Sequence, residues 1–73
     1  MSTAILTSED EGDIMATMRN KRAAYLISVY PDVEITGIGF EGYNYTDFYC
    51  YRNGDCILFR VRDYNNTYLI TER

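Results

Sequence analysis

A turn signal in the second half of the chain constrains the fold more than any other feature. Asn53-Gly54 lies between two runs of β-branched and aromatic residues. This pair is the preferred sequence for a two-residue type I′ turn, which joins two antiparallel strands. A turn of this kind sets which residues lie opposite each other, and therefore which side chains share a face of the sheet. The sequence thus predicts a β-hairpin of defined register.

The register predicts two faces of different character. Next to the turn Arg52 pairs with Asp55, and since side chains alternate along a strand, every second pair shares a face. One face is apolar and is expected to form the core, with Thr46, Phe48, Cys50, Ile57, Phe59 and Val61. The opposite face, here called the outer face, is expected to carry Tyr45, Asp47, Tyr49, Tyr51, Cys56, Leu58, Arg60 and Arg62.

Two weaker turn signals extend the hairpin into a sheet. Asn65-Asn66 can adopt the positive φ of a tight turn, and Glu41-Gly42 is a weaker candidate. Four strands are predicted: Val33 to Phe40, Tyr43 to Arg52, Asp55 to Tyr64, and Thr67 to Thr71. On the core face these turns pair Ile35 with Phe48, Val33 with Cys50, and Val61 with Ile70; on the outer face they place Ile38 beside Tyr45 and Leu69 beside Arg62. The predicted core is Val33, Ile35, Phe48, Cys50, Ile57, Phe59, Val61, Tyr68 and Ile70. A bulge at Gly37 or Gly39 would break the first of these pairings.

The segment before the sheet has the periodicity of a helix. Ser8 followed by Glu11 has the spacing of a capping box, which predicts a helix start at Ser8. Apolar residues then recur at helical spacing: Ile14, Met15, Met18, Tyr25, Leu26 and Val29. Arg22 falls on this stripe, and we expect its stem to pack while its head reaches water. Pro31 ends the helix. Residues 1–7 are a flexible tail or, around residues 4–6, a short strand; the two alternatives stay open.

Together these patterns predict a single α+β domain over residues 1–73, in which an N-terminal helix packs on one face of a four-stranded antiparallel meander sheet. A chain of 73 residues buries a small core, so a partner subunit would add to its stability.

The composition argues against most catalytic and metal chemistry. The chain has no histidine, which removes the usual general base and the commonest metal ligand. Cys50 and Cys56 are expected on opposite faces, so we predict no disulfide, and two thiols are too few for a structural zinc site. Glu34 and Asp47 can approach on adjacent strands but lack a cleft. We therefore expect no cofactor, no metal and no enzyme activity, although a tyrosine acting as a general acid stays open.

No apolar run approaches the roughly 20 residues of a membrane span, and the first residues do not read as a secretory signal. We therefore expect a cytoplasmic protein with reduced cysteines and no contact with a membrane.

The outer face is the candidate binding surface, because tyrosine and arginine are enriched at interaction hot spots. The candidate partner-binding residues are Tyr45, Asp47, Tyr49, Tyr51, Leu58, Arg60 and Arg62. Asp47 and Arg60 are expected to form a cross-strand ion pair, with Arg62 over the Tyr45 ring. The partner is either a second copy, giving a homodimer, or a different protein. The plain alternative is that these tyrosines are ordinary strand formers.

Single-stranded nucleic acid is a further alternative for the outer face, because aromatic rings stack on bases and arginines follow phosphates. The formal net charge of −4 and the position of Asp47 argue against it. Four acidic residues lie near the predicted start of the helix, where the helix dipole favours negative charge: Glu9, Asp10, Glu11 and Asp13. As a mimic of phosphates, this cluster is a secondary candidate for partner binding.

In its small size, acidic charge, lack of histidine and single adhesive surface, the chain resembles accessory proteins of bacteriophages and mobile elements. This resemblance covers no motif. It implies a protein that inhibits or modulates a host protein, such as a CRISPR–Cas effector or another defence factor, in the cytoplasm of a bacterial host.

Overall fold

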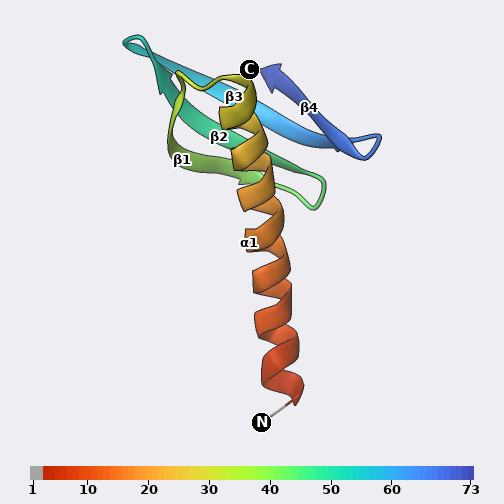
Figure 1. The fold of residues 1–73 in the computed structure, drawn as a ribbon. Coiled ribbons are helices and arrows are strands. Elements are labelled where there is room, and N and C mark those ends of the chain that lie inside the picture. The colour runs from red at the N-terminus through yellow and green to blue at the C-terminus, as the bar shows by residue number, and fades with distance from the viewer. Residues whose placement is uncertain (1–2) are drawn as a thin grey trace.

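Over residues 3–73 the fold is one helix on a four-stranded sheet (Figure 1). The computed structural model describes the backbone of residues 3–73 and the side chains of residues 14–73. Its elements are α1 (Thr3–Val29), β1 (Glu34–Glu41), β2 (Tyr45–Arg52), β3 (Asp55–Tyr64) and β4 (Thr67–Glu72). The strands are antiparallel and lie in the order β1-β2-β3-β4, with α1 against one face. The predicted α+β meander is therefore confirmed.

Helix α1 starts earlier than its sequence signals predict. It begins at Thr3, so Ser8 lies inside the helix and the predicted cap at Ser8 is wrong. Residues 4–6 are helical, so the predicted short strand there is wrong too. No glycine or proline interrupts residues 3–8, so nothing local prevents the helix from extending. At about 1.5 Å per residue, α1 is about 40 Å long, and its N-terminal half projects beyond the sheet (Figure 1). In the part of the chain that the structure describes, no helix is long and apolar enough to cross a lipid bilayer.

The β2–β3 hairpin has the predicted register throughout, from Arg52 opposite Asp55 to Tyr45 opposite Arg62. Asn53 and Gly54 have φ of 53° and 89°, which is the left-handed conformation that a type I′ turn requires. Asn65 and Asn66 repeat this conformation with φ of 47° and 63°. The predicted pairing of β3 with β4 is therefore also confirmed, including Val61 opposite Ile70.

The predicted register between β1 and β2 is wrong, because β1 contains two bulges. Ile35 lies opposite Cys50, Gly37 opposite Tyr49, and Ile38 opposite Phe48. Residues 42–44 form the connection, in place of a two-residue turn at Glu41-Gly42. Since directly opposed residues share a face, Ile38 lies on the helix side with Phe48, and its predicted outer position is a second error.

The core lies between α1 and the sheet and contains every residue predicted for it. The fully buried apolar residues are Leu26, Val33, Phe48, Cys50, Phe59 and Val61, with Ala23, Tyr25, Tyr30, Ile35, Ile57, Tyr68 and Ile70 packed around them. Two aromatic contacts join the layers: the ring centroids of Tyr25 and Tyr68 are 5.1 Å apart, as are those of Tyr30 and Phe59. These contacts fix which face of the sheet is left open.

Candidate functional site on the outer face of the sheet

The outer face is a layer of exposed aromatic and aliphatic side chains on β2, β3 and β4. The exposed fraction is 52% for Tyr49, 44% for Tyr51 and 42% for Leu69. Every predicted partner-binding residue of the sheet lies on this face: Tyr45, Asp47, Tyr49, Tyr51, Leu58, Arg60 and Arg62. The side chains of the secondary candidates, Glu9, Asp10, Glu11 and Asp13, lie outside the described residues.

Sequence reasoning missed one member of the face. Tyr64 is 50% exposed and lies opposite Thr67, two positions after Arg62. Alternation along β3 therefore puts Tyr64 on the same face as Arg62, and the Arg62 guanidinium carbon lies 6.0 Å from the centre of the Tyr64 ring. The sequence could have shown this, because the Asn65-Asn66 turn pairs Tyr64 with Thr67 and so assigns Tyr64 to the outer face.

An ion pair with two hydrogen bonds lies in the middle of the face. Asp47 is 2% exposed and accepts two hydrogen bonds from Arg60, from Nε at 2.7 Å and from Nη2 at 3.0 Å. This hydrogen bonding to Asp47 raises the pKa of the Arg60 guanidinium. The predicted ion pair is thus confirmed. Asp47 is therefore buried beneath the face and paired with Arg60, and the guanidinium is the more exposed member of the pair.

The stacking predicted for Arg62 on Tyr45 is wrong, since Arg60 occupies that position. The Arg60 guanidinium carbon lies 4.3 Å from the centre of the Tyr45 ring. Arg60 can reach both groups because it directly faces Asp47 on β2, two positions from Tyr45. Arg62 is displaced toward Tyr64 and keeps an exposed head.

Tyr49 is seated on the backbone of β1. The two bulges place Gly37 and Gly39 beneath its ring, and a Cβ added at Gly39 would lie 3.3 Å from Tyr49 Cε2 and 3.4 Å from Asp47 Cβ. Neither glycine has a positive φ. Their role is therefore to leave room for the close approach of the ring, which holds an exposed tyrosine in one place.

Beside Tyr49 the outer face is hollowed. The hollow is open, has a volume of about 500 Å³, and is lined by Thr36, Tyr49, Cys50, Cys56, Ile57, Leu58 and Arg73. Cys56 is an exposed free thiol on this face, whereas Cys50 is buried on the other face and burial raises the pKa of its thiol. An aromatic or aliphatic wall with an arginine at its rim suits a large apolar side chain of a partner.

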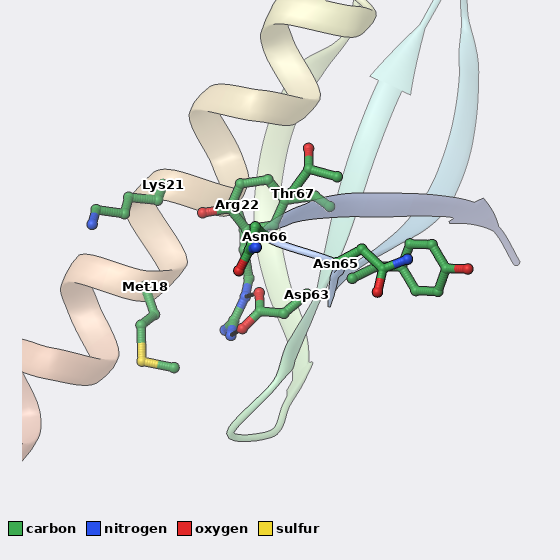
Figure 2. Close-up of a pocket in the computed structure, with 9 residues that line it drawn as sticks. Met18, Lys21, Arg22, Asp63, Asn65, Asn66 and Thr67 are labelled. Carbon is green, nitrogen blue, oxygen red and sulfur yellow. Dashed lines mark hydrogen bonds and ion pairs between the residues drawn. The ribbon is translucent and has the colours of Figure 1, made fainter.

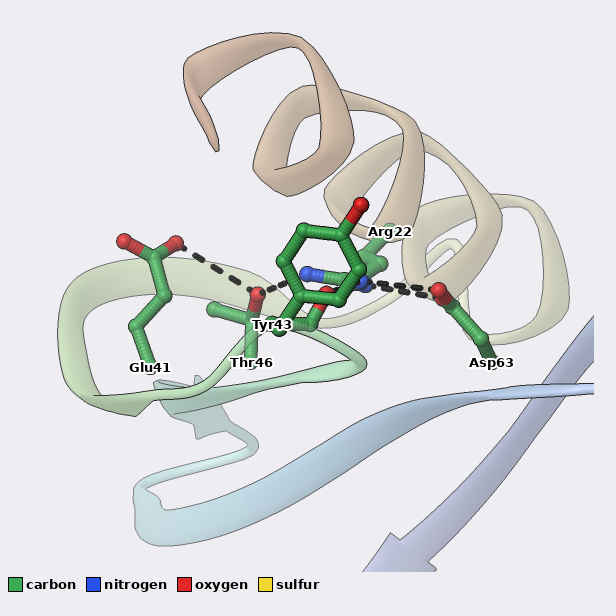
Figure 3. Close-up of polar contacts among 5 residues, drawn as sticks. All are labelled: Arg22, Glu41, Tyr43, Thr46 and Asp63. Carbon is green, nitrogen blue, oxygen red and sulfur yellow. Dashed lines mark hydrogen bonds and ion pairs between the residues drawn. The ribbon is translucent and has the colours of Figure 1, made fainter. Parts of the chain in front are cut away.

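The helix side of the sheet holds a second arginine, whose predicted environment is wrong. Arg22 is fully buried, and its head does not reach water. It donates to both carboxylate oxygens of Asp63, at 3.0 and 2.9 Å, to Thr46 Oγ1 at 3.2 Å, and to the carbonyl oxygen of Tyr43 at 2.9 Å (Figure 3). These acceptors come from β2, β3 and the loop between β1 and β2. A pattern within the helix carries no information about them.

This buried arginine fixes the loop over residues 42–44. The loop is held by Arg22 at the carbonyl of Tyr43 and by the Asp63 backbone N–H, which donates to the carbonyl of Asn44 at 2.8 Å. Tyr43 is 78% exposed, and Phe40, near the end of β1, is 76% exposed. The fold thus displays an exposed tyrosine on a well-anchored backbone, outside the outer face.

A second hollow, of about 470 Å³, lies between α1 and the β3–β4 hairpin (Figure 2). Met18, Lys21 and Arg22 line it from the helix, and residues 63–68 line it from the hairpin. Arg22 and Asp63 are engaged with each other, so they offer little to a ligand. Among the described residues, no group of three or more His, Cys, Asp or Glu side chains is placed to hold a metal ion.

Comparisons of this chain with protein-family models, with curated proteins and with solved structures return no match. Function is therefore inferred from the geometry of the chain's own residues.

Proposed function

We propose that this chain is a non-catalytic protein-binding module, and that its outer face docks on a larger protein and inhibits or modulates it. The observation that carries this proposal is the exposed Tyr49, Tyr51, Tyr64 and Leu69 on a face that α1 leaves open. Several large apolar side chains exposed on one open face are typical of a surface that binds a partner. Tyrosines also supply much contact area at a low cost in conformational entropy.

The details of the face support docking on a folded surface. Tyr49 rests on glycine backbone, and Tyr45 is covered by the Arg60–Asp47 pair. Both rings are thus held before any partner arrives, which reduces the entropy lost on binding. The hollow beside Tyr49 provides a place for one anchor side chain of the partner. Arg62 and Arg73 provide positive charge at the rim.

The class of partner follows from the resemblance in size and composition to accessory proteins of bacteriophages and mobile elements. On that basis the target is a host protein, such as a CRISPR–Cas effector or another defence factor, in the bacterial cytoplasm. Occlusion of a functional surface of the target by the outer face is the mode of inhibition that a small rigid module of this kind can exert.

One observation favours single-stranded nucleic acid as a second candidate. Asp47, the acidic residue in the middle of the face, is buried and neutralised by Arg60. A phosphate approaching the face therefore meets Arg62 and the tyrosine rings before it meets this carboxylate. The formal net charge of −4 still opposes binding at a distance.

The experiment places a photo-reactive benzoylphenylalanine at Tyr49 or, as a control, at Ile38, and exposes each variant to the proteins of a host extract. Ile38 is 43% exposed but lies on the helix side of the sheet. We expect one protein to be captured from position 49 and not from 38, and an excess of unlabelled wild-type chain to prevent the capture.

The affinity of variants for the purified target then tests which residues of the outer face contribute to binding. Tyr49→Ala with Leu58→Ala should weaken binding by about 100-fold or more, as loss of two hot-spot side chains does. Tyr43 is 78% exposed but lies outside this face, so Tyr43→Ala should leave binding unchanged. Equal loss in both variants would contradict the assignment. Binding of a labelled oligothymidine that weakens steeply with salt would favour the nucleic-acid candidate.

A further inference from the structure

The two edges of the sheet differ in how they are protected. An edge strand exposes unpaired backbone groups, and bulges and charged residues normally prevent it from pairing with another chain. β1 has both devices: two bulges, and glutamates at Glu34 and Glu41. β4 pairs with β3 without any register shift and contains no glycine or proline, and its one charged residue is the terminal Glu72.

The direction of the backbone groups of β4 follows from its turn. A two-residue turn makes Tyr64 and Thr67 a hydrogen-bonded pair, and such pairs alternate with non-hydrogen-bonded ones. The backbone N–H of Arg73 donates to the carbonyl of Leu58 at 2.7 Å, which agrees with this alternation. Tyr68 and Ile70 therefore direct their N–H and C=O groups away from β3. Within the described residues, no element lies beyond β4 in the sheet.

We propose that β4 pairs antiparallel with β4 of a second copy of this chain, about a two-fold axis at Leu69. Residues directly opposite each other must point to the same face. With Leu69 opposite Leu69 of the second copy, Tyr68 lies opposite Ile70, and the two exchange their unpaired N–H and C=O groups. The register is apolar on both faces: a leucine pair on the outer face, and a tyrosine–isoleucine pair on the helix side.

The charges agree with this register. Thr67 lies opposite Thr71, and Glu72 lies opposite Asn66 of the second copy. No charged side chain faces one of the same sign, so the pairing meets none of the repulsion that would oppose it in a charged edge.

The dimer extends the sheet to eight strands, twice the four of one chain, and leaves the outer face free apart from Leu69, which lies at the axis. A two-fold axis perpendicular to the sheet places both helices on one side and both outer faces on the other. The dimer thus presents two binding faces to a target with repeated sites, where avidity adds to the affinity of each face. This pairing does not depend on the proposed function of the outer face.

The first test compares the mass in solution of the wild type, Leu69→Lys and Ile38→Lys by sedimentation over a range of concentrations. Leu69 and Ile38 are exposed to 42% and 43%, so the two lysines are matched in exposure and lie on opposite edges. We expect the wild type and Ile38→Lys to dimerise alike. Two lysines facing each other at the axis should raise the dissociation constant of Leu69→Lys by about tenfold or more.

The second test fixes the register by cross-linking, and also guards against a variant that fails to fold. Cys56→Ser removes the exposed thiol, and Leu69→Cys or Thr71→Cys is then introduced. A non-hydrogen-bonded antiparallel pair has its Cα atoms about 4.5 Å apart, within the range that a disulfide spans. Mild oxidation should join two chains through Cys at 69 but not at 71.

A wild type that stays monomeric up to millimolar concentration, a Leu69→Lys dimer of unchanged affinity, or preferential cross-linking at 71 would each overturn the proposal. Tyr49→Ala with Leu58→Ala should dimerise as the wild type does. If this double variant loses target binding but still dimerises, the outer face and the β4 edge are independent binding surfaces.

Discussion

Each face of the sheet holds an arginine bonded to an aspartate through two hydrogen bonds, but the burial of the two pairs is reversed. On the helix side, the side chain of Arg22 is 1% exposed and that of Asp63 is 45% exposed. On the outer face, the side chain of Arg60 is 29% exposed and that of Asp47 is 3% exposed. The buried member of each pair depends on the exposed one, because an unpaired charge away from water is costly.

The two ion pairs also differ in which parts of the molecule they connect. The Arg22 pair connects α1 with the loop over residues 42–44 and with β3, so it holds together segments that are distant in sequence. The Arg60 pair connects two neighbouring strands and lays a flat cation over Tyr45. One pair therefore organises the fold, and the other organises a surface.

Removal of the buried cation should give the largest effect. Arg22→Ala leaves Thr46 Oγ1 and the Tyr43 carbonyl without their donor and should lower the free energy of unfolding by about 3 kcal/mol. Lys21→Ala, at the exposed neighbouring position, should change it by less than about 0.5 kcal/mol. Urea denaturation followed by circular dichroism measures both. Similar small losses in the two variants would show that Arg22 does not hold the helix to the sheet.

The reversed burial predicts that the more exposed aspartate matters more. Asp63→Ala leaves Arg22 buried without its carboxylate, and should cost about 2–3 kcal/mol of unfolding free energy. Asp47→Ala leaves Arg60, which can turn to water, and should cost about 1–2 kcal/mol. Denaturant titrations of the two variants under one set of conditions give the comparison. The opposite order would mean that exposure of the carboxylate, and not the environment of its arginine, sets the effect.

The glycines beneath Tyr49 offer a matched pair of substitutions on the outer face. A Cβ at Gly39 would be 3.3 Å from the Tyr49 ring, whereas at Gly37 it would be at an ordinary 3.7 Å. Gly39→Ala should therefore destabilise by about 1 kcal/mol, and Gly37→Ala should be close to neutral. Thermal unfolding and target affinity should change together in Gly39→Ala only. An equal response at both positions would argue against a fixed seat for the ring.

The two thiols also differ in burial between the two faces, and we expect them to give the smallest effect on stability. Exposed Cys56 should react rapidly with a thiol reagent, while buried Cys50 should react only as the chain unfolds. Burial raises the pKa of Cys50 above its ordinary 9.0, so the unfolded thiol ionises first. The contribution of the neutral Cys50 thiol to the unfolding free energy is therefore complete below pH 9.0, and it is lost as the pH rises through the pKa of the folded state. The difference in unfolding free energy between the wild type and Cys50→Ala should thus fall above pH 9.0; an increase would refute the assignment.

Local chemistry explains which parts of this structure could be predicted. Asn53-Gly54 and Asn65-Asn66 determine their own turn conformations, and alternation then assigns nearly every side chain of β2, β3 and β4 to a face. In β1 the glycines indicate that a bulge is possible, but not where the extra residues are placed. The burial of Arg22 could not be predicted from the sequence for a different reason. Its partner Asp63 is 41 positions away, so no local pattern links the two residues.

That separation of 41 positions has a kinetic consequence. Each hairpin closes a loop of two or three residues, so the strands can associate early, at little cost in chain entropy. Docking of α1 closes a much longer loop, and its buried cation gains its acceptors only once β2 and β3 are side by side. We therefore expect the helix to join last during folding and to be the first element released when native chains open, so that its backbone amides exchange with solvent before those of the central strands.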